Sequence, residues 1–292
     1  MVKETCRFVK DYKNQKALRD SFNQLIEKTF SLNFEAWYQN GFWGDHYVQY
    51  SIAESEHIVS SISVMTIEYQ VRGKIRHYAQ LGGVATDPAY RNQGLSKVLM
   101  NHVIEDYQTR VDGLFLFGND SVLDFYPRFG FRAHTEYCYF KTAEYQQKMT
   151  AQRISMNTKK DWEPLIAAVE HSACNGALEM MHNSGLVMFY VMSFMKDMVY
   201  YVEDHQAYVI AEIEGEILRP YAVYSQKEVD LDRILTAFGS QIKRAELQFT
   251  PLNTTGYQCK VRKEEDCTLF MLGKEFEDFE SHKMTFPVIS HT

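Results

Sequence analysis

The sequence has little cysteine, no excess of positive charge and no long apolar run. Its 292 residues include 5 cysteines, 31 lysines and arginines, and 38 aspartates and glutamates, which gives a net charge of −7. The cysteines form no Cys-x-x-Cys pair, and no His-x-x-x-His cluster occurs, so the sequence predicts no metal site. Scattered thiols, odd in number, favour a reduced, cytoplasmic protein.

These absences also bear on partners. Without a basic patch, the acidic chain is expected to bind no nucleic acid and to favour cationic partners. The longest apolar run, at 186–195, is interrupted by Ser193 and is too short to span a bilayer, so we expect a core segment and no membrane partner. Met1–Glu4 does not resemble a signal peptide. The balance of 45% hydrophobic and 24% charged residues is typical of a globular protein.

A strand, a loop and a helix follow one another between residues 75 and 108. The extended run 75–81 leads into Gly82-Gly83, a pair that predicts a bulge. The helix is indicated by apolar residues at helical spacing, namely Leu95, Val98, Leu99 and Val103, with His102 expected as a core histidine on the same face. Between them lies Arg91–Ser96, which has the form Arg-x-x-Gly-x-Ser.

A loop of this kind at the start of a helix suits an anion. The first N–H groups of a helix have no partner within it, and the positive end of the helix dipole lies there, so phosphate binds well. Gly94 would let the backbone approach the anion, and Arg91 adds a positive charge. A plain connection with an ordinary glycine has the same sequence, so the loop alone leaves both interpretations open.

The rest of the chain gives this stretch its context. Three strands, at 47–54, 57–71 and 75–81, are expected to form an antiparallel meander before the loop. After it, we expect a strand at 114–117, a helix from Asp120 or Ser121 with a kink at Pro127, and a last strand at 137–140.

The polar segment 141–152 is interpreted as a linker. The second half repeats the order of strands and helices but lacks a second phosphate-type loop. The sequence therefore predicts two domains, residues 1–150 and a degenerate copy at 151–292.

The ordered set of motifs resembles the GNAT superfamily of acetyl-CoA-dependent N-acetyltransferases. Arg91–Ser96 is similar to its pyrophosphate loop, with Ser96 where glycine or alanine is usual. Val-Ala-Thr-Asp-Pro at 84–88 and Tyr-x-x-x-Gly-Phe at 126–131 are also similar to family motifs. The two-part layout looks like the enhanced-intracellular-survival type. The resemblance implies an α/β (α+β) fold of tandem GNAT-like domains, each a mixed, mostly antiparallel sheet flanked by helices.

The resemblance also implies roles for individual residues. The backbone of Val84, Ala85 and Thr86 would bind the pantetheine arm, and the Val84 N–H would polarise the acetyl carbonyl. The pyrophosphate would be held by Arg91, Asn92, Gln93, Gly94, Leu95, Ser96 and Lys97. Asn119 would face the cofactor. Tyr126 would protonate the departing thiolate, because a phenol keeps its proton at neutral pH. A tyrosine in isolation is more typical of packing, and its place in the motif favours catalysis.

The acceptor side is less defined. With acetyl-CoA as cosubstrate and no metal, the acceptor would be the primary amine of a cationic small molecule or peptide. Glu68 and the carboxylate of Thr292 are candidate bases, although Glu68 is equally well a solvated strand residue. A contact between copies of the chain is left open. An acyl-CoA-binding regulatory or scaffolding module without turnover, or a structural protein without cofactor, remains as an alternative.

Overall fold

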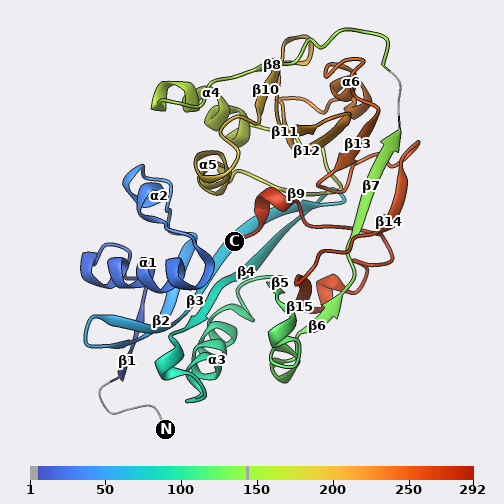
Figure 1. Ribbon diagram of the computed structural model, residues 1–292. Coiled ribbons are helices and arrows are strands. Elements are labelled where there is room, and N and C mark those ends of the chain that lie inside the picture. Colours follow the sequence, from blue (N-terminus) through green and yellow to red (C-terminus); the bar gives the residue numbers. More distant parts are fainter. Residues whose placement is uncertain (1–5, 143–144) are drawn as a thin grey trace.

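The structure is a computed structural model that describes residues 6–142 and 145–292. Two mixed sheets, each flanked by helices, lie at opposite ends of the molecule (Figure 1). The predicted fold class of tandem α/β units is confirmed. Residues 143–144 of the predicted linker lie outside the described residues.

The first sheet has eight strands and carries the predicted meander. Its order is β1 (Cys6–Lys10), β2 (Tyr47–Glu54), β3 (His57–Val71), β4 (Lys74–Thr86), β5 (Gly113–Gly118), β15 (Thr268–Leu272) and β6 (Arg132–His134), with β9 (Leu178–Met180) paired to β3. The pair β4–β5 is parallel, and the other pairs in this sheet are antiparallel.

The second sheet has seven strands. Its order is β14 (Gln258–Val261), β7 (Tyr137–Thr142), β13 (Arg244–Leu247), β12 (Ile217–Tyr224), β11 (Ala207–Glu214), β10 (Val199–Val202) and β8 (Gln152–Arg153). Its parallel pair is β12–β13, which corresponds to β4–β5 in the first sheet. The repeat that the sequence predicts is therefore visible in the pairing pattern.

The two sheets exchange strands. The expected last strand of the first half, β7, lies between β13 and β14 of the second sheet, whereas β15 from the second half lies between β5 and β6. The division at residue 150 stays a prediction, and each sheet contains strands from both sides of it.

The helices are α1 (Lys16–Phe30), α2 (Glu35–Gln39), α3 (Leu95–Tyr107), α4 (Lys159–Glu170), α5 (Ser184–Ser193) and α6 (Leu231–Thr236). α1 and α5 pack on one face of the first sheet and α3 on the other, whereas α6 packs on the second sheet. Side chains alternate along β2 and β3, so that Tyr50 and Ile62 pack toward α3 while Tyr47 and Met65 pack toward α1 and α5. We call these the α3 face and the α1/α5 face.

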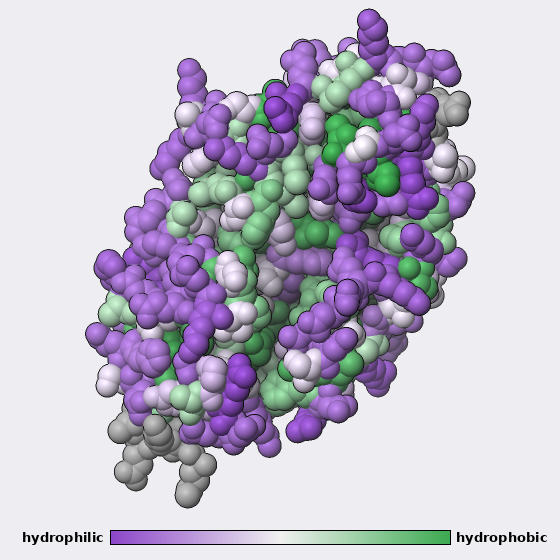
Figure 2. Space-filling view, in the orientation of Figure 1, coloured by the Kyte–Doolittle hydropathy of each residue, from purple (hydrophilic) through white to green (hydrophobic). Residues whose placement is uncertain are grey.

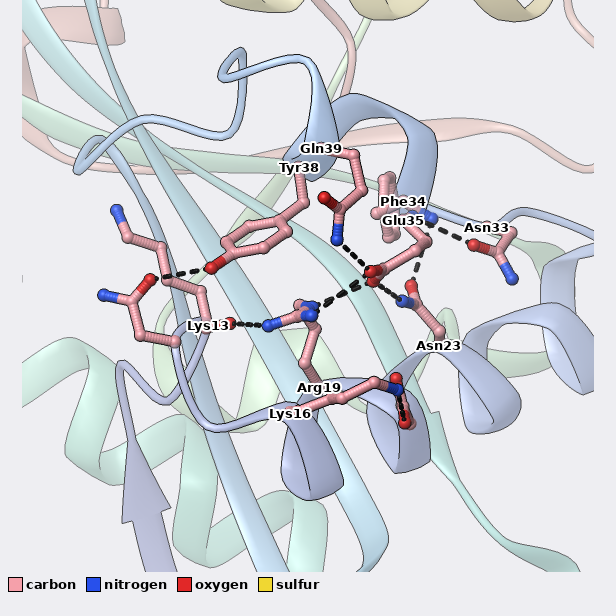
Figure 3. Close-up of polar contacts among 11 residues, drawn as sticks. Lys13, Lys16, Arg19, Asn23, Asn33, Phe34, Glu35, Tyr38 and Gln39 are labelled. Carbon is pink, nitrogen blue, oxygen red and sulfur yellow. Dashed lines mark hydrogen bonds and ion pairs between the residues drawn. The ribbon is translucent and has the colours of Figure 1, made fainter.

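A partly buried ion pair fixes α2 to α1 (Figure 3). Arg19 of α1 is 4% exposed and donates from Nε to Glu35 Oε2 at 2.8 Å and from Nη1 to the Lys13 carbonyl at 2.6 Å. The Arg19 guanidinium holds the pKa of the Glu35 carboxyl below its ordinary value. The Tyr38 ring lies 3.9 Å below the same guanidinium. Arg19 thus sets where the aromatic residues of α2 lie.

Two local predictions are wrong. The predicted helix at 120–129 is instead a pair of 3₁₀ turns, Asp120–Val122 and Tyr126–Phe129, because Pro127 has no N–H and disfavours helical dihedrals at the residue before it. His102 is exposed and stacks on Phe8 with the ring centroids 4.5 Å apart, since Met100 and Val103 occupy the buried face of α3.

Most of the apolar run at 186–195 is buried within α5, as expected, whereas Phe194 directly after α5 is exposed. Within residues 6–142 and 145–292, none of the helices combines the length and the apolar character that crossing a bilayer demands.

Candidate active site

The predicted bulge lies on β4. Ser61 pairs with Ala85 and Ser63 pairs with Gly82, so that Gly83 and Val84 together lie opposite the single residue Ile62. The extra residue takes backbone groups of β4 out of the ladder with β3. The interpretation of Gly82-Gly83 as a break in the strand is confirmed.

Beside the bulge, β4 and β5 separate. Their parallel pairing runs from Tyr78–Gly113 to Leu81–Leu116 and then stops, although β4 continues to Thr86. From Phe117 onward, β5 is paired only with β15. The edge of β4 at residues 82–86 therefore has no strand partner on the side of β5. Figure 2 shows apolar side chains in a furrow near the middle of the face in view.

The Arg-x-x-Gly-x-Ser loop opens onto solvent at the start of α3. Asn92 and Gly94 have left-handed backbone, with φ of 61° and 79°. A Cβ on Gly94 would meet no atom within 4 Å. Within the described residues, the main-chain N–H groups of 92–97 have no hydrogen-bond partner. Open N–H groups at the positive end of a helix fit a phosphate.

The side chains of the loop divide into two groups. Arg91, Asn92 and Lys97 are exposed, whereas Leu95 is buried. The Ser96 hydroxyl points inward and lies 2.9 Å from Thr86 Oγ1, which in turn lies 2.8 Å from Ser60 Oγ. Ser96 therefore fixes α3 to the end of β4.

Tyr126 lies on the α3 face at the end of β5. Its side chain is 3% exposed, and a Cβ on Gly118 would come within 2.9 Å of its Cε2. Burial raises the pKa of Tyr126 to about 12. Its hydroxyl has no hydrogen-bond partner among the described residues. The hydroxyl oxygen is also not among the fully buried side-chain atoms that lack a partner, so it is accessible.

Comparison with known proteins identifies this segment. Residues 14–134 match the model of the acetyltransferase (GNAT) domain family. These residues form a GNAT domain. The matched range contains the bulge of β4, the loop at α3 and Tyr126, and it ends before β7. No curated protein matches the chain significantly.

Solved structures share the fold over most of the chain. A conserved protein from Enterococcus faecalis V583 has a TM-score of 0.58 at 15% identity, covering 94% of this chain and 74% of that one. A GCN5-related N-acetyltransferase from Kribbella flavida has a TM-score of 0.57 at 15% identity, covering 91% and 70%.

Eis1 from Mycobacterium abscessus has a TM-score of 0.52 at 12% identity, covering 90% of this chain and 72% of that one. At such identities these likenesses establish a common fold. They extend the resemblance beyond the GNAT domain to the two-part layout of the chain.

The GNAT domain brings most of the predicted site residues together. Val84, Ala85 and Thr86 lie on the bulged end of β4, and Arg91–Lys97 follow directly at the start of α3. Asn119 is exposed at the end of β5, where its Oδ1 accepts a hydrogen bond from Ser121 Oγ at 2.7 Å. Tyr126 follows within the same turn region. Their roles stay predictions.

The two candidate bases lie in different places. Glu68 pairs with His77, five residues before Gly82 on β4, which corresponds to about 16 Å along the strand. Thr292 lies at the bulge, since a Cβ on Gly82 would come within 2.5 Å of its main-chain oxygen. The structure thus separates Glu68 from the rest of the site.

Residues that the sequence analysis missed line the α1/α5 face. The His291 ring stacks on Phe117 at 3.8 Å, and Tyr190 donates a hydrogen bond to the His291 carbonyl at 2.8 Å. Burial holds the pKa of His291 at about 3. The Tyr69 hydroxyl donates to Ser290 Oγ at 2.9 Å. The last residues of the chain thus form a wall of the GNAT domain.

Proposed function

We propose that the chain transfers the acetyl group of acetyl-CoA directly to a primary amine in a ternary complex. The observation that carries the proposal is the adjacency of two features. The bulged edge of β4 has no strand partner on the side of β5, and the N–H groups of 92–97, unpaired within the described residues, follow within ten residues at the start of α3. The match of residues 14–134 to an acetyltransferase domain supports the same activity.

The residues present fit the cosubstrate. The N–H groups of 92–97, unpaired within the described residues, would hold the pyrophosphate together with Arg91 and Lys97 beside them. The open space at Gly94 lets an anion approach the backbone. The edge of β4 from Val84 to Thr86 would pair with the amides of the pantetheine arm, as another strand would.

Transfer requires one bond to form and one to break. The acceptor nitrogen bonds to the acetyl carbon while the carbon–sulfur bond breaks. The Val84 N–H would stabilise the negative charge on the carbonyl oxygen. Tyr126 would donate its hydroxyl proton to the departing sulfur, for which its free hydroxyl suits it. The carboxylate of Thr292, which lies at the bulge, or a water molecule would take the proton from the amine.

Replacing Tyr126 by phenylalanine is expected to lower kcat by about a hundredfold, within the range for losing a general acid. The KM for acetyl-CoA should change little, because the ring still packs on Phe270. Release of free thiol with a panel of primary amines gives both constants.

Tyr107→Phe is the matched control, since Tyr107 is another buried phenol on the α3 face at the far end of α3. It should leave kcat within about twofold of wild type. If Tyr126→Phe is as fast as wild type on every amine that wild type accepts, the acid role is wrong. If wild type binds coenzyme A and acetylates no amine, the chain is a binding module without turnover.

The pH dependence should show a rising limb only. Below its pKa of about 10.4, a primary amine has about ten times more free base for each unit by which the pH rises. Because burial raises the pKa of Tyr126 to about 12, the acid stays protonated throughout the usual range. The kcat/KM for the amine should therefore climb from pH 6 to about pH 9.5 without a decline. A falling limb below pH 9 would contradict Tyr126 as the acid.

A further inference from the structure

On the α1/α5 face, helix α1 lies directly against the bulge of β4. A Cβ on Gly83 would come within 3.2 Å of Ile26 Cδ1 and within 3.4 Å of Ser63 Oγ. Ile26 is 1% exposed and Ser63 is 0% exposed, so both side chains are enclosed by the core. Ile26 Cδ1 therefore sets how close to Gly83 any other group can come on this face.

The position of Ile26 is fixed by the packing of α1. One turn before it on the same helix, Phe22 is 0% exposed and stacks on Phe34 with the ring centroids 5.9 Å apart. Two residues after it, Lys28 Nζ lies 3.3 Å from Asp87 Oδ2, just beyond the end of β4. Close-packed side chains of this kind yield little to an added group. The Ile26 side chain is therefore a rigid wall beside the bulge.

The neighbouring glycine of the bulge is also covered on this face. A Cβ on Gly82 would come within 2.5 Å of the Thr292 main-chain oxygen. Gly82 pairs with Ser63 of β3, and Ser63 pairs with Gln49 of β2, so these residues form one row across the sheet. The bulge is thus bounded on the α1/α5 face by Ile26 at Gly83 and by Thr292 at Gly82. Such a site leaves room for a small group only.

We propose that Ile26 determines the length of the acyl group, restricting the donor to acetyl-CoA among the acyl-CoA thioesters. The proposal rests on the proposed function, in which the Val84 N–H binds the carbonyl oxygen of the thioester. Gly83 directly precedes Val84, and α3 and Tyr126 belong to the other face of the sheet. An acyl chain that extends from the carbonyl toward the α1/α5 face would therefore meet Ile26 Cδ1.

The expected selectivity follows from the packing. An additional methylene group in an apolar pocket changes kcat/KM by about 10- to 200-fold. Wild type should therefore use propionyl-CoA with a kcat/KM at least about tenfold below that for acetyl-CoA, and butyryl-CoA should be poorer again.

The test shortens the Ile26 side chain in two steps. Ile26→Val removes only Cδ1, the atom nearest to Gly83, and should raise the ratio of kcat/KM for propionyl-CoA to that for acetyl-CoA about tenfold. Ile26→Ala also removes the γ carbons and should raise the ratio for butyryl-CoA to a similar extent. Release of free thiol, with one amine held constant and the acyl donor varied, gives these ratios.

Leu18→Ala is the matched control for lost packing. Leu18 is 3% exposed and lies on α1 eight residues before Ile26, which corresponds to about 12 Å along the helix. Leu18→Ala and Ile26→Ala should both lower Tm, because each empties a buried site. Only the Ile26 variants should change the preference among acyl donors, since Leu18 is far from the bulge.

Several results would overturn the inference. They are a wild-type acyl preference in both Ile26 variants, an equal change of preference in Leu18→Ala, and use of butyryl-CoA by wild type as efficiently as acetyl-CoA. If Ile26→Ala does not fold, Ile26→Val with propionyl-CoA decides the question, because the loss of one methyl group costs little stability.

Calorimetric binding in the absence of an amine separates this inference from the proposed function. Butyryl-CoA should bind Ile26→Ala about tenfold more tightly than it binds wild type, whereas coenzyme A, which carries no acyl group, should bind both equally. If this difference is found although no amine is acylated, the acyl site stands and the proposed function fails. If wild type acetylates amines and both proteins bind butyryl-CoA equally, the function stands and the inference fails. If wild type binds no acyl-CoA, both fail.

Discussion

Replacing Phe286 by alanine is expected to lower the free energy of unfolding by about 3–5 kcal/mol, the range for emptying a buried aromatic site. Phe286 is 0% exposed, and its ring stacks on Phe115 of β5 with the centroids 4.0 Å apart and the planes 3° apart. Tyr69 of β3 lies 5.3 Å away, edge-on. Phe286 therefore fixes the end of the chain under the first sheet.

Urea unfolding, monitored through the fluorescence of Trp37, Trp43 and Trp162, measures the loss. Phe194→Ala is the matched control, since Phe194 ends α5 and is 53% exposed. We expect it to change the free energy of unfolding by about 0.5 kcal/mol or less. Equal losses in the two variants would mean that Phe286 is not a core residue of the first sheet.

The same substitution reaches the candidate site. Phe286 precedes Ser290, His291 and Thr292 by a few residues, and these form the wall at the bulge. The main chain of Phe286 is also held in the core by Glu136, because the Phe286 N–H donates a hydrogen bond to Glu136 Oε1 at 2.9 Å. Loosening this segment should therefore raise the KM for the amine more than the KM for acetyl-CoA.

The sequence alone predicts those features of the structure that a few neighbouring residues determine. A glycine pair within a strand predicts a bulge, and the register of β3 against β4 confirms one at Gly82–Val84. Helical spacing after Gly94 predicts α3, which begins at Leu95. Both features depend on dihedral freedom and side-chain pattern over a few residues, which can be read directly.

Strand partners could not be read in the same way. The segment Tyr137–Phe140 is a strand, as predicted, yet it pairs with β13 and β14 of the second sheet. A short apolar strand can join any sheet with a free edge, and its partner is decided by packing across the whole molecule. The exchange of β7 and β15 therefore has no local signal.

The position of Gln49, Ser63 and Gly82 in one row across the sheet could be predicted only with knowledge of the strand register. Ser61 and Ser63 alternate within the apolar strand 57–71, which was a sign that one face of it is polar. Which partner each serine faces depends on pairing, and a slip of one residue would exchange the two faces. Gln49, Ser63 and Gly82 become one row only when the ladders of β2, β3 and β4 are known.

Replacing Gly94 by aspartate is expected to weaken coenzyme A binding by about a hundredfold, or about 2.7 kcal/mol. The new carboxylate would occupy the open space at the start of α3, where the N–H groups of 92–97 are unpaired within the described residues. It would repel the pyrophosphate and compete with it for the same donors. Calorimetric titration with coenzyme A measures the change.

Gly73→Asp separates this effect from backbone strain. Gly73 lies in the turn between β3 and β4, at the end of β4 away from the bulge. Its φ is +81° against +79° for Gly94, and a Cβ on either residue would meet no atom within 4 Å. The two substitutions therefore impose similar strain, and only Gly94→Asp should weaken binding. Equal weakening would assign the effect to strain, and unchanged binding in both would place the coenzyme away from α3.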